Sequence, residues 1–152
     1  MKKSKKLKKI GRKDIIDLPE LELFDLEAKV DTGAFSSALH CDSVELLHDG
    51  DNSYLLVRLH PEEELDGESL EFIFDEFSET LIRNSFGQEE HRFKINTAIK
   101  IFGKIIHTDF TLSNRGALKF PLLLGRKFLK KRFIVDVSKR NLSYKKKLKK
   151  GS

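Results

Sequence analysis

The sequence predicts a small, mostly β domain that closes into a barrel or sandwich and carries one short helix near its C-terminal end. Several segments alternate apolar and polar residues with period two, as half-buried strands do. Turn-forming residues separate these segments at short intervals, which is typical of small sandwiches and barrels. The length of 152 residues is enough for one domain with a single core.

The secondary-structure elements follow from these two patterns. We expect strands at residues 22–30, 54–59, 70–74, 92–101, 105–112 and 133–137. Turns are expected at 49–52, where the sequence reads Asp-Gly-Asp-Asn, and at Phe102-Gly103-Lys104. The stretch 126–132 is the helix candidate, because Phe128 and Leu129 can both face a core.

Basic residues gather at the two ends of the chain. Residues 1–13 hold eight Lys and Arg and no acid, and residues 139–150 hold seven and no acid. The other fourteen basic residues lie with all 24 acids in the body, which is therefore strongly acidic although the whole chain has a net charge of +5. We predict a basic disordered tail at 1–10, a domain at 11–144 and a basic C-terminal tail at 145–152.

Three interpretations of the basic ends stay open. They are solvated tails that keep the protein soluble, or they contact RNA, ribosomes or another polyanion through phosphates. In the third interpretation they dock on acidic surfaces of another copy, an association that salt would weaken. No aromatic residue interrupts the N-terminal lysines, so base stacking is not expected there.

The cysteine count and the hydropathy indicate a compartment. Cys41 is the only cysteine, so an intramolecular disulfide is excluded and a reducing cytoplasm is the natural location. The first lysines are followed by Ile10-Gly11-Arg12, which is not the apolar stretch of a secretory signal. No run approaches the roughly 18 apolar residues of a membrane span. We therefore expect a cytoplasmic protein without membrane contact.

Asp31-Thr32-Gly33 is the triplet most indicative of chemistry. It follows the apolar end of the strand expected at 22–30. An isolated Asp before a turn most often caps a backbone group. A second segment makes this triplet more significant, because the apolar run at 122–124 ends in Gly125 just before the helix candidate. We expect the three leucines of that run to lie in the core.

Together these two segments resemble retropepsin-like aspartic proteases, in which the Asp-Thr/Ser-Gly loop and an apolar-apolar-Gly segment pack into a ψ-shaped loop beneath the catalytic carboxylate. The stretches 29–34, 37–40, 111–115, 123–126 and 133–136 are similar to a bacterial and archaeal subgroup labelled as ATP-dependent zinc proteases. Members of this subgroup are often encoded with, or fused to, ATP-grasp ligases that add glutamate to proteins. The resemblance runs from about Gly11 to Tyr144.

The resemblance implies an aspartic endopeptidase in which two carboxylates flank a water molecule. Because the chain has one Asp-Thr-Gly, a homodimer would supply one Asp31 from each subunit. The Thr32 hydroxyl would bond backbone across the dimer axis, and Gly33 would allow the backbone to approach closely. A peptide or protein would be the substrate.

The same resemblance implies a substrate-covering flap between the Asp-Thr-Gly loop and the ψ segment. Residues 82–90 fall there and contain turn formers, although an ordinary surface hairpin is the alternative. The expected substrate-binding residues are Ala34, Asn84, Ser85, Phe86 and Gly87, and the expected supports of the ψ loop are Leu123, Leu124, Gly125 and Arg126. Arg126 either begins a solvated helix or pairs with a carboxylate such as Asp136. Asn114 and Arg115 either bind substrate or end a strand.

The residues do not support the zinc and ATP in the subgroup's label. There is no His-Glu-x-x-His and no Gly-x-x-x-x-Gly-Lys-Ser/Thr. His40, Cys41 and His48 lack the spacing of a structural zinc site, so we expect no metal and no cofactor. Two other functions stay open: a catalytically silent peptide-binding module that acts as a scaffold for a partner ATP-grasp ligase, and an RNA- or ribosome-associated platform. The intact Asp-Thr-Gly favours the enzyme.

Overall fold

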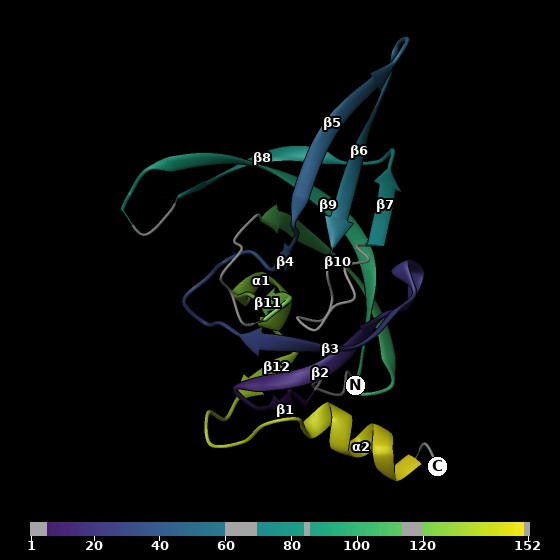
Figure 1. The fold of residues 1–152 in the computed structure, drawn as a ribbon. Helices are drawn as coiled ribbons and strands as arrows, with labels where there is room; N and C mark the ends of the chain where they lie inside the picture. The colour runs from purple at the N-terminus through teal and green to yellow at the C-terminus, as the bar shows by residue number, and fades with distance from the viewer. Residues whose placement is uncertain (1–5, 60–69, 84–85, 114–119, 151–152) are drawn as a thin grey trace, which may run out of the picture.

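The computed structural model describes residues 6–59, 70–83, 86–113 and 120–150 (Figure 1). Its strands are β1 (Lys8–Ile10), β2 (Lys13–Leu18), β3 (Leu23–Val30), β4 (Ala38–His40), β5 (Ser43–Asp49), β6 (Asn52–Leu59), β7 (Leu70–Phe74), β8 (Ser78–Arg83), β9 (Glu89–Ile101), β10 (Lys104–Ser113), β11 (Leu122–Leu124) and β12 (Phe133–Val135). The helical elements are η1 (Pro19–Leu21), α1 (Arg126–Leu129) and α2 (Leu142–Lys150). The fold is mostly β, as predicted.

The main sheet closes on itself. Its strands follow the order β10-β4-β11-β3-β2-β9, and β9 pairs with β10 to complete the ring. β8 extends this sheet from β9, and the smaller sheets β5-β6-β7 and β1-β12 are added to it (Figure 1). The predicted closed barrel or sandwich in one domain is therefore confirmed.

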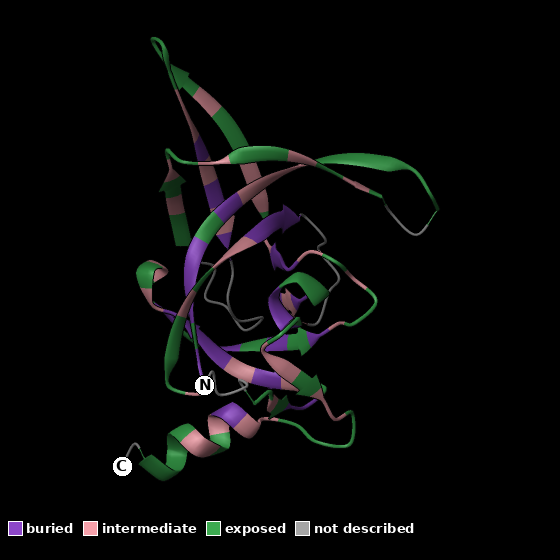
Figure 2. Ribbon diagram, turned by 180° about the vertical axis from the view of Figure 1, so that it is seen from behind, coloured by how far each residue is buried: buried purple, intermediate pink, exposed green. Residues whose placement is uncertain are grey.

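The alternating pattern of the predicted strands corresponds to burial. In β3, Leu26, Ala28 and Val30 are buried and the residues between them are exposed. The alternation breaks at Asp25, which has a φ of 55° where the register between β2 and β3 shifts. Figure 2 shows buried residues along the barrel strands and mostly exposed residues on the hairpin of β8 and the start of β9. Each fully buried Leu or Ile contributes about 1.5–3 kcal/mol through the hydrophobic effect.

The long strand β9 connects the barrel to a projecting hairpin. Its C-terminal half pairs with β10 through the predicted turn, where Phe102 and Gly103 have φ values of 51° and 73°. Two consecutive left-handed residues give the tight hairpin turn that matches strand twist. Its N-terminal half pairs with β8, and this hairpin extends away from the barrel (Figure 1).

The N-terminal basic segment differs from the predicted disordered tail at 1–10. Residues 8–10 form β1, which pairs in parallel with β12, and Ile10 is fully buried. A Cβ added to Gly11 would collide with the Lys139 carbonyl group, so only glycine allows the two segments to pack this closely. The apolar Ile10 and this close contact hold the segment in place.

The C-terminal basic segment is also structured, because its lysines belong to the unpredicted helix α2. The buried Asp14 carboxylate accepts hydrogen bonds from the N–H groups of Ser143 (2.9 Å) and Tyr144 (3.1 Å) at the first turn of α2. A carboxylate at this position satisfies unpaired N–H groups and complements the helix dipole. Lys147 forms ion pairs with Asp17 and Asp25. Among the described residues, no helix is long and apolar enough to cross a membrane.

Candidate active site

The loop that carries Asp31 is held by a strand inserted between its two ends. β11 pairs in parallel with β3 through Leu124 and Val30, and antiparallel with β4 through Leu123 and Ala38. Residues 31–37 connect β3 to β4 and therefore pass around β11 and the start of α1 (Figure 1). This is the ψ-shaped packing that the resemblance implied for the two segments.

Asp31 is fixed at the point where β3 ends. Its N–H donates to the Leu124 carbonyl oxygen at 2.9 Å, and the residue is half-buried. One carboxylate oxygen, Oδ1, accepts the N–H of Gly33 at 3.0 Å. A Cβ at Gly33 would lie 3.3 Å from that same oxygen, so the close approach expected at this glycine is to the Asp31 carboxylate. Thr32 is exposed in the single chain, and its role across a dimer axis stays a prediction.

Gly125 and the first residues of α1 pack against the Asp31 loop and form hydrogen bonds with it. A Cβ at Gly125 would lie 2.6 Å from the Ser36 carbonyl oxygen. Its N–H donates to the Ser37 hydroxyl at 3.0 Å, and the N–H groups of Arg126 and Lys127 donate to the carbonyls of Ala34 and Phe35, each at 2.9 Å. The first N–H groups of a helix have no partner within the helix. The carbonyl groups of the loop accept these N–H groups of α1, and the same hydrogen bonds fix the position of the loop.

Of the two alternatives for Arg126, the structure shows the first: Arg126 begins α1 and is exposed, and it does not pair with Asp136. Its Nη1 donates to the Thr32 carbonyl oxygen at 3.0 Å, and its guanidinium lies 5.8 Å from the centre of the Phe35 ring. Asp136 follows β12, which pairs with β1, and there it accepts hydrogen bonds from Ser138 and pairs with Lys9 at 3.8 Å. Arg126 therefore holds the backbone of the Asp31 loop.

Asp31 opens into a cleft of about 630 Å³ between its loop and the hairpin of β8 and β9. The loop contributes residues 31 and 33–36, and the hairpin contributes Leu81, Ile82, Arg83 and Arg92. Leu123 is half-buried and lines this cleft, whereas Leu122 and Leu124 are fully buried. The expectation that all three leucines are core was therefore wrong at Leu123, because alternate residues of β11 point in opposite directions.

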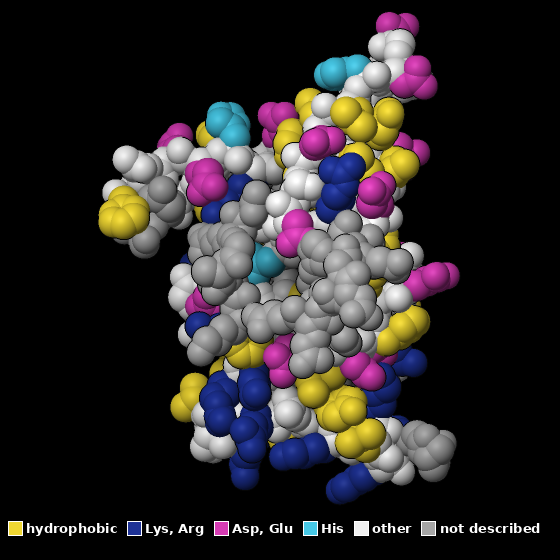
Figure 3. Space-filling view, in the orientation of Figure 1, with side chains coloured by type: hydrophobic (Ala, Val, Ile, Leu, Met, Phe, Trp, Pro, Cys, Tyr) yellow, Lys and Arg dark blue, Asp and Glu magenta, His cyan; other side chains and the backbone are white. Residues whose placement is uncertain are grey.

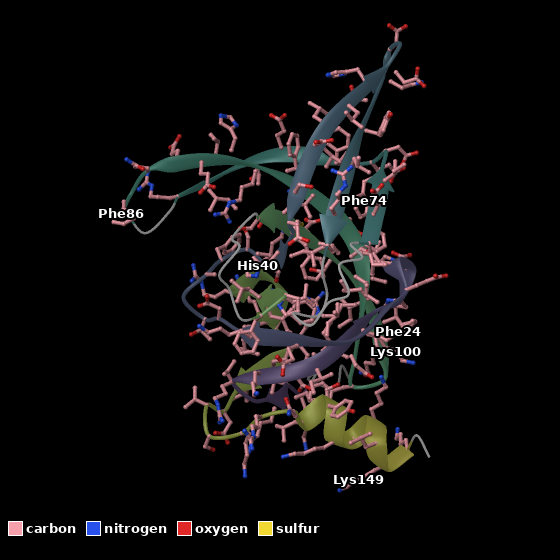
Figure 4. All side chains as sticks on the ribbon, viewed as in Figure 1. Phe24, His40, Phe74, Phe86, Lys100 and Lys149 are labelled. Atoms are coloured by element: carbon pink, nitrogen blue, oxygen red, sulfur yellow. The ribbon has the colours of Figure 1, made fainter. Side chains whose placement is uncertain are left out.

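The predicted hairpin is present, and the half of it nearer its tip borders the cleft through Leu81, Ile82 and Arg83. Arg83 of β8 pairs with Glu89 of β9, and Asn84 and Ser85 lie outside the described residues, as do Asn114 and Arg115. At the tip, Phe86 is 87% exposed and Gly87 has a φ of 78°. Figure 4 shows Phe86 at the far end of the hairpin, away from His40 and the barrel. Closure of this hairpin as a flap stays a prediction.

Three guanidinium groups give the cleft a basic lining. Arg83, Arg92 and Arg126 line it, and Asp31 is the one carboxylate among its described lining residues. The Arg92 side chain is only 9% exposed; its Nη2 lies 3.2 Å from Glu90, and its Nε is buried with no hydrogen-bond partner among the described residues. A buried donor without a partner is costly. Sequence reasoning missed Arg92, because an Arg on an alternating strand is normally exposed.

The histidines and the cysteine considered as zinc ligands have other environments. His40 lines the cleft, and its Nδ1 lies 2.5 Å from the Phe120 carbonyl oxygen, which requires that nitrogen to donate. Cys41 is buried, and this burial raises the pKa of its thiol to about 12. His48 contacts Ser53 on the β5–β6 hairpin. The described residues contain no group of three or more potential ligands for a metal ion.

Removing metal ions should leave this protein unchanged. After dialysis against a strong chelator we expect the same melting temperature and the same rate in an assay for the peptide hydrolysis that the resemblance implies, because no zinc ligand set is assembled in the described part of the chain. A peptide-like inhibitor of aspartic proteases should reduce the activity of the same sample. Activity lost on chelation and restored by one equivalent of zinc would contradict this prediction.

Comparisons with known proteins agree with these observations. Residues 9–146 match the RimB-like family, which is described as retropepsin-like aspartic endopeptidase RimB. A crystal structure of a protein of unknown function from Legionella pneumophila has the same fold, with a TM-score of 0.68 and 23% identity over 90% of this chain and 98% of that one.

Curated relatives carry a different kind of name. A probable alpha-L-glutamate ligase of Desulfotalea psychrophila is 31% identical over 127 residues, and one of Shewanella pealeana is 26% identical over 129 residues. These matches cover 84% and 85% of this chain but only 27% and 28% of the relatives. The chain therefore spans about a quarter of the length of these relatives.

Proposed function

The chain belongs to the RimB-like family of retropepsin-like aspartic endopeptidases, and we propose that it hydrolyses peptide bonds through two Asp31 carboxylates, one from each subunit of a homodimer. The observation that carries this proposal is the position of Asp31, which ends β3 beside β11 and opens into a cleft large enough for a peptide segment. A cytoplasmic location is part of the proposal, in keeping with the single free cysteine.

The chemistry requires both carboxylates and one shared proton. The ionised carboxylate takes a proton from the water molecule between them, and the protonated one donates to the carbonyl oxygen of the peptide bond. Two carboxylates that share a site resist double ionisation, so they titrate as a pair. In this mechanism the Gly33 N–H holds one oxygen of Asp31 and thereby orients the carboxylate toward the water.

The second carboxylate is expected from another subunit. The sequence contains one Asp-Thr-Gly, and no other carboxylate belongs to the described lining of the cleft. Asp136, the alternative within the chain, is held by Ser138 and Lys9, and these contacts keep its pKa below the usual value. A two-fold axis beside Asp31 supplies an identical partner without a second motif.

An acidic peptide is the substrate class that the cleft favours. Arg83, Arg92 and Arg126 offer several N–H donors, and guanidinium groups bind carboxylates in two-pronged geometry. Relatives of this chain are named probable alpha-L-glutamate ligases. We therefore propose that the enzyme cleaves glutamate-rich segments, such as those that a partner ligase of this kind would add.

Replacing Arg92 with glutamine tests this substrate class. For a peptide of consecutive glutamates we expect KM to rise by about tenfold or more, which corresponds to roughly 1.4 kcal/mol, because a buried charged donor is lost. For the matching glutamine peptide, KM should stay within about twofold of the wild-type value, because no substrate carboxylate pairs with Arg92.

Arg58→Gln is the matched control, because Arg58 lies on β6, pairs with Glu71 and is outside the cleft lining. It should leave KM for both peptides unchanged. If Arg92→Gln raised KM equally for the glutamate and glutamine peptides, the proposed preference for an acidic substrate would be excluded. The proposed peptidase activity would be unaffected by that result. If the wild-type protein cleaved neither peptide nor any other substrate, the proposed peptidase itself would be overturned.

A further inference from the structure

A second hollow lies at the end of the molecule that carries β1, β12 and α2. Its volume is about 340 Å³, and it shares no lining residue with the Asp31 cleft. Its cationic lining residues are Lys6, Lys8, Lys104 and Arg132, and its aromatic lining residues are Phe102 and Phe133. Figure 3 shows Lys and Arg side chains gathered at this end of the molecule. We call this site the basic hollow.

The positive charge of the basic hollow is not balanced by nearby acids. No carboxylate lines it, and none of its four cations forms an ion pair with a carboxylate among the described residues. By contrast, Lys9 and Lys147 are paired with acids. Contact with the Lys146 side chain, burial and the charges of Lys146, Lys104 and Lys150 lower the pKa of Lys8. Crowded like charges cost stability, and a bound anion relieves that cost.

The apolar part of the hollow is formed by the rings of Phe102 and Phe133 together with the isoleucines at 101, 105 and 106. The Lys8 Nζ lies 4.8 Å from the centre of the Phe102 ring. The centres of Phe102 and Phe133 are 5.8 Å apart, and both rings are half-buried. Phe102 comes from the β9–β10 turn and Phe133 from β12. The N-terminal lysines have no aromatic neighbour in the sequence, but the fold places these two rings beside them.

We propose that the basic hollow binds single-stranded nucleic acid, with phosphates on its lysines and arginine and one base against Phe102. Proteins that bind single strands combine a cationic groove with aromatic stacking surfaces, and here Phe102 and Phe133 line the same hollow as four cationic side chains. A volume of about 340 Å³ suits a ligand the size of one nucleotide. An anionic membrane would instead favour a protruding apolar face above its cations, whereas these rings lie in a hollow.

The test measures binding of the full chain to a fluorescent twelve-nucleotide oligouridine by anisotropy at several salt concentrations. Wild-type protein should bind, with an affinity that falls as salt rises. The double variant Lys8→Glu, Lys104→Glu should bind at least about tenfold more weakly, and its log–log salt slope should be smaller by about 1.4, because each lost phosphate contact removes about 0.7. Equal melting temperatures establish that both proteins are folded.

Lys13→Glu, Lys29→Glu is the matched control, because these residues face each other on β2 and β3 outside the hollow and give the same change in net charge. Its affinity should fall by less than about threefold. Equal weakening of oligouridine binding by the two double variants would overturn the proposal, because the net charge of the protein would then explain the binding without a specific site. No binding of oligouridine by the wild-type protein would overturn it as well.

A competition experiment tests the contact with a base. Inorganic polyphosphate carries the charge without bases, so at equal phosphate concentration it should compete at least about fivefold less well than unlabelled oligouridine. Equal competition would leave a plain anion site and contradict the proposal. Tighter binding to phosphatidylserine vesicles than to oligouridine, abolished by Lys8→Glu, Lys104→Glu, would instead assign the basic hollow to a membrane surface.

Discussion

Replacing Asp31 with asparagine should lower the rate of peptide hydrolysis by at least about 1,000-fold, the scale of lost acid–base catalysis. The amide has nearly the shape of the carboxylate but does not accept the proton of the attacking water. Its side-chain oxygen can still accept the Gly33 N–H, so the loop should keep its conformation. The melting temperature should therefore change by less than about 2 °C, as for a substitution that breaks no packing.

Asp136→Asn is the control for this prediction, because Asp136 is the alternative second carboxylate within the chain and lies outside the cleft lining. It should keep full activity. An Asp31→Asn protein as active as the wild type would exclude Asp31 as a catalytic residue. Loss of activity in Asp136→Asn, with an unchanged melting temperature, would assign the second carboxylate to the same chain.

Replacing Gly125 with alanine should destabilise the protein by about 1–3 kcal/mol, the cost of overpacking a tight site, and should also reduce its activity. Gly125 has a φ of −92°, which alanine adopts freely, so the cost is steric. The new methyl group would lie 2.6 Å from the Ser36 carbonyl oxygen and 2.7 Å from that of Phe35. These are backbone atoms of the Asp31 loop, so relief of the clash must move the loop. Thermal melting and a kcat measurement test both effects.

Gly50→Ala separates loop displacement from a general loss of stability. Gly50 has a φ of 64° in the β5–β6 turn and no atom within 4 Å of an added Cβ. Alanine there should cost about 1–2 kcal/mol through backbone strain but leave kcat unchanged. If Gly125→Ala matched the wild type in melting temperature and kcat, the close packing of Gly125 against the Asp31 loop would contribute to neither stability nor catalysis.

The sequence predicts those strands in which apolar and polar residues alternate or an apolar run stands out locally. The alternation at 22–30 and 92–101 corresponds to β3 and to most of β9, because each strand has one face toward the core. Strands β1, β4 and β11 have three residues each, too few for a periodic signal, and the longer strands β2, β5 and β8 were not predicted either. Pairing with other strands defines all six. The first turn of helix α2 is capped by Asp14, more than 120 residues earlier in the chain, and the local sequence does not reveal this long-range cap.

The residues of the candidate site also fall into two groups, those that stand in local sequence motifs and those that are defined by tertiary contacts. Asp31 and Gly125 stand in contiguous motifs, so the resemblance to retropepsin-like proteases locates both from the amino-acid sequence alone. Arg92 and Ser37 act through tertiary contacts: the buried Arg92 lines a cleft between two distant segments, and Ser37 accepts the Gly125 N–H. Neither residue differs locally from an ordinary surface Arg or loop Ser. Residues 8–10 lack a local signal for a similar reason, since β1 forms by pairing with the distant strand β12.

Mixed dimers test most directly the proposal that two subunits share one catalytic pair. Wild-type and Asp31→Asn chains are combined in equal amounts, allowed to exchange subunits, and compared with wild-type protein at the same total concentration. Random pairing leaves about one quarter of the dimers with two Asp31 carboxylates, so the mixture should have about one quarter of the wild-type activity. An activity of one half, as independently active subunits give, would contradict the shared dyad.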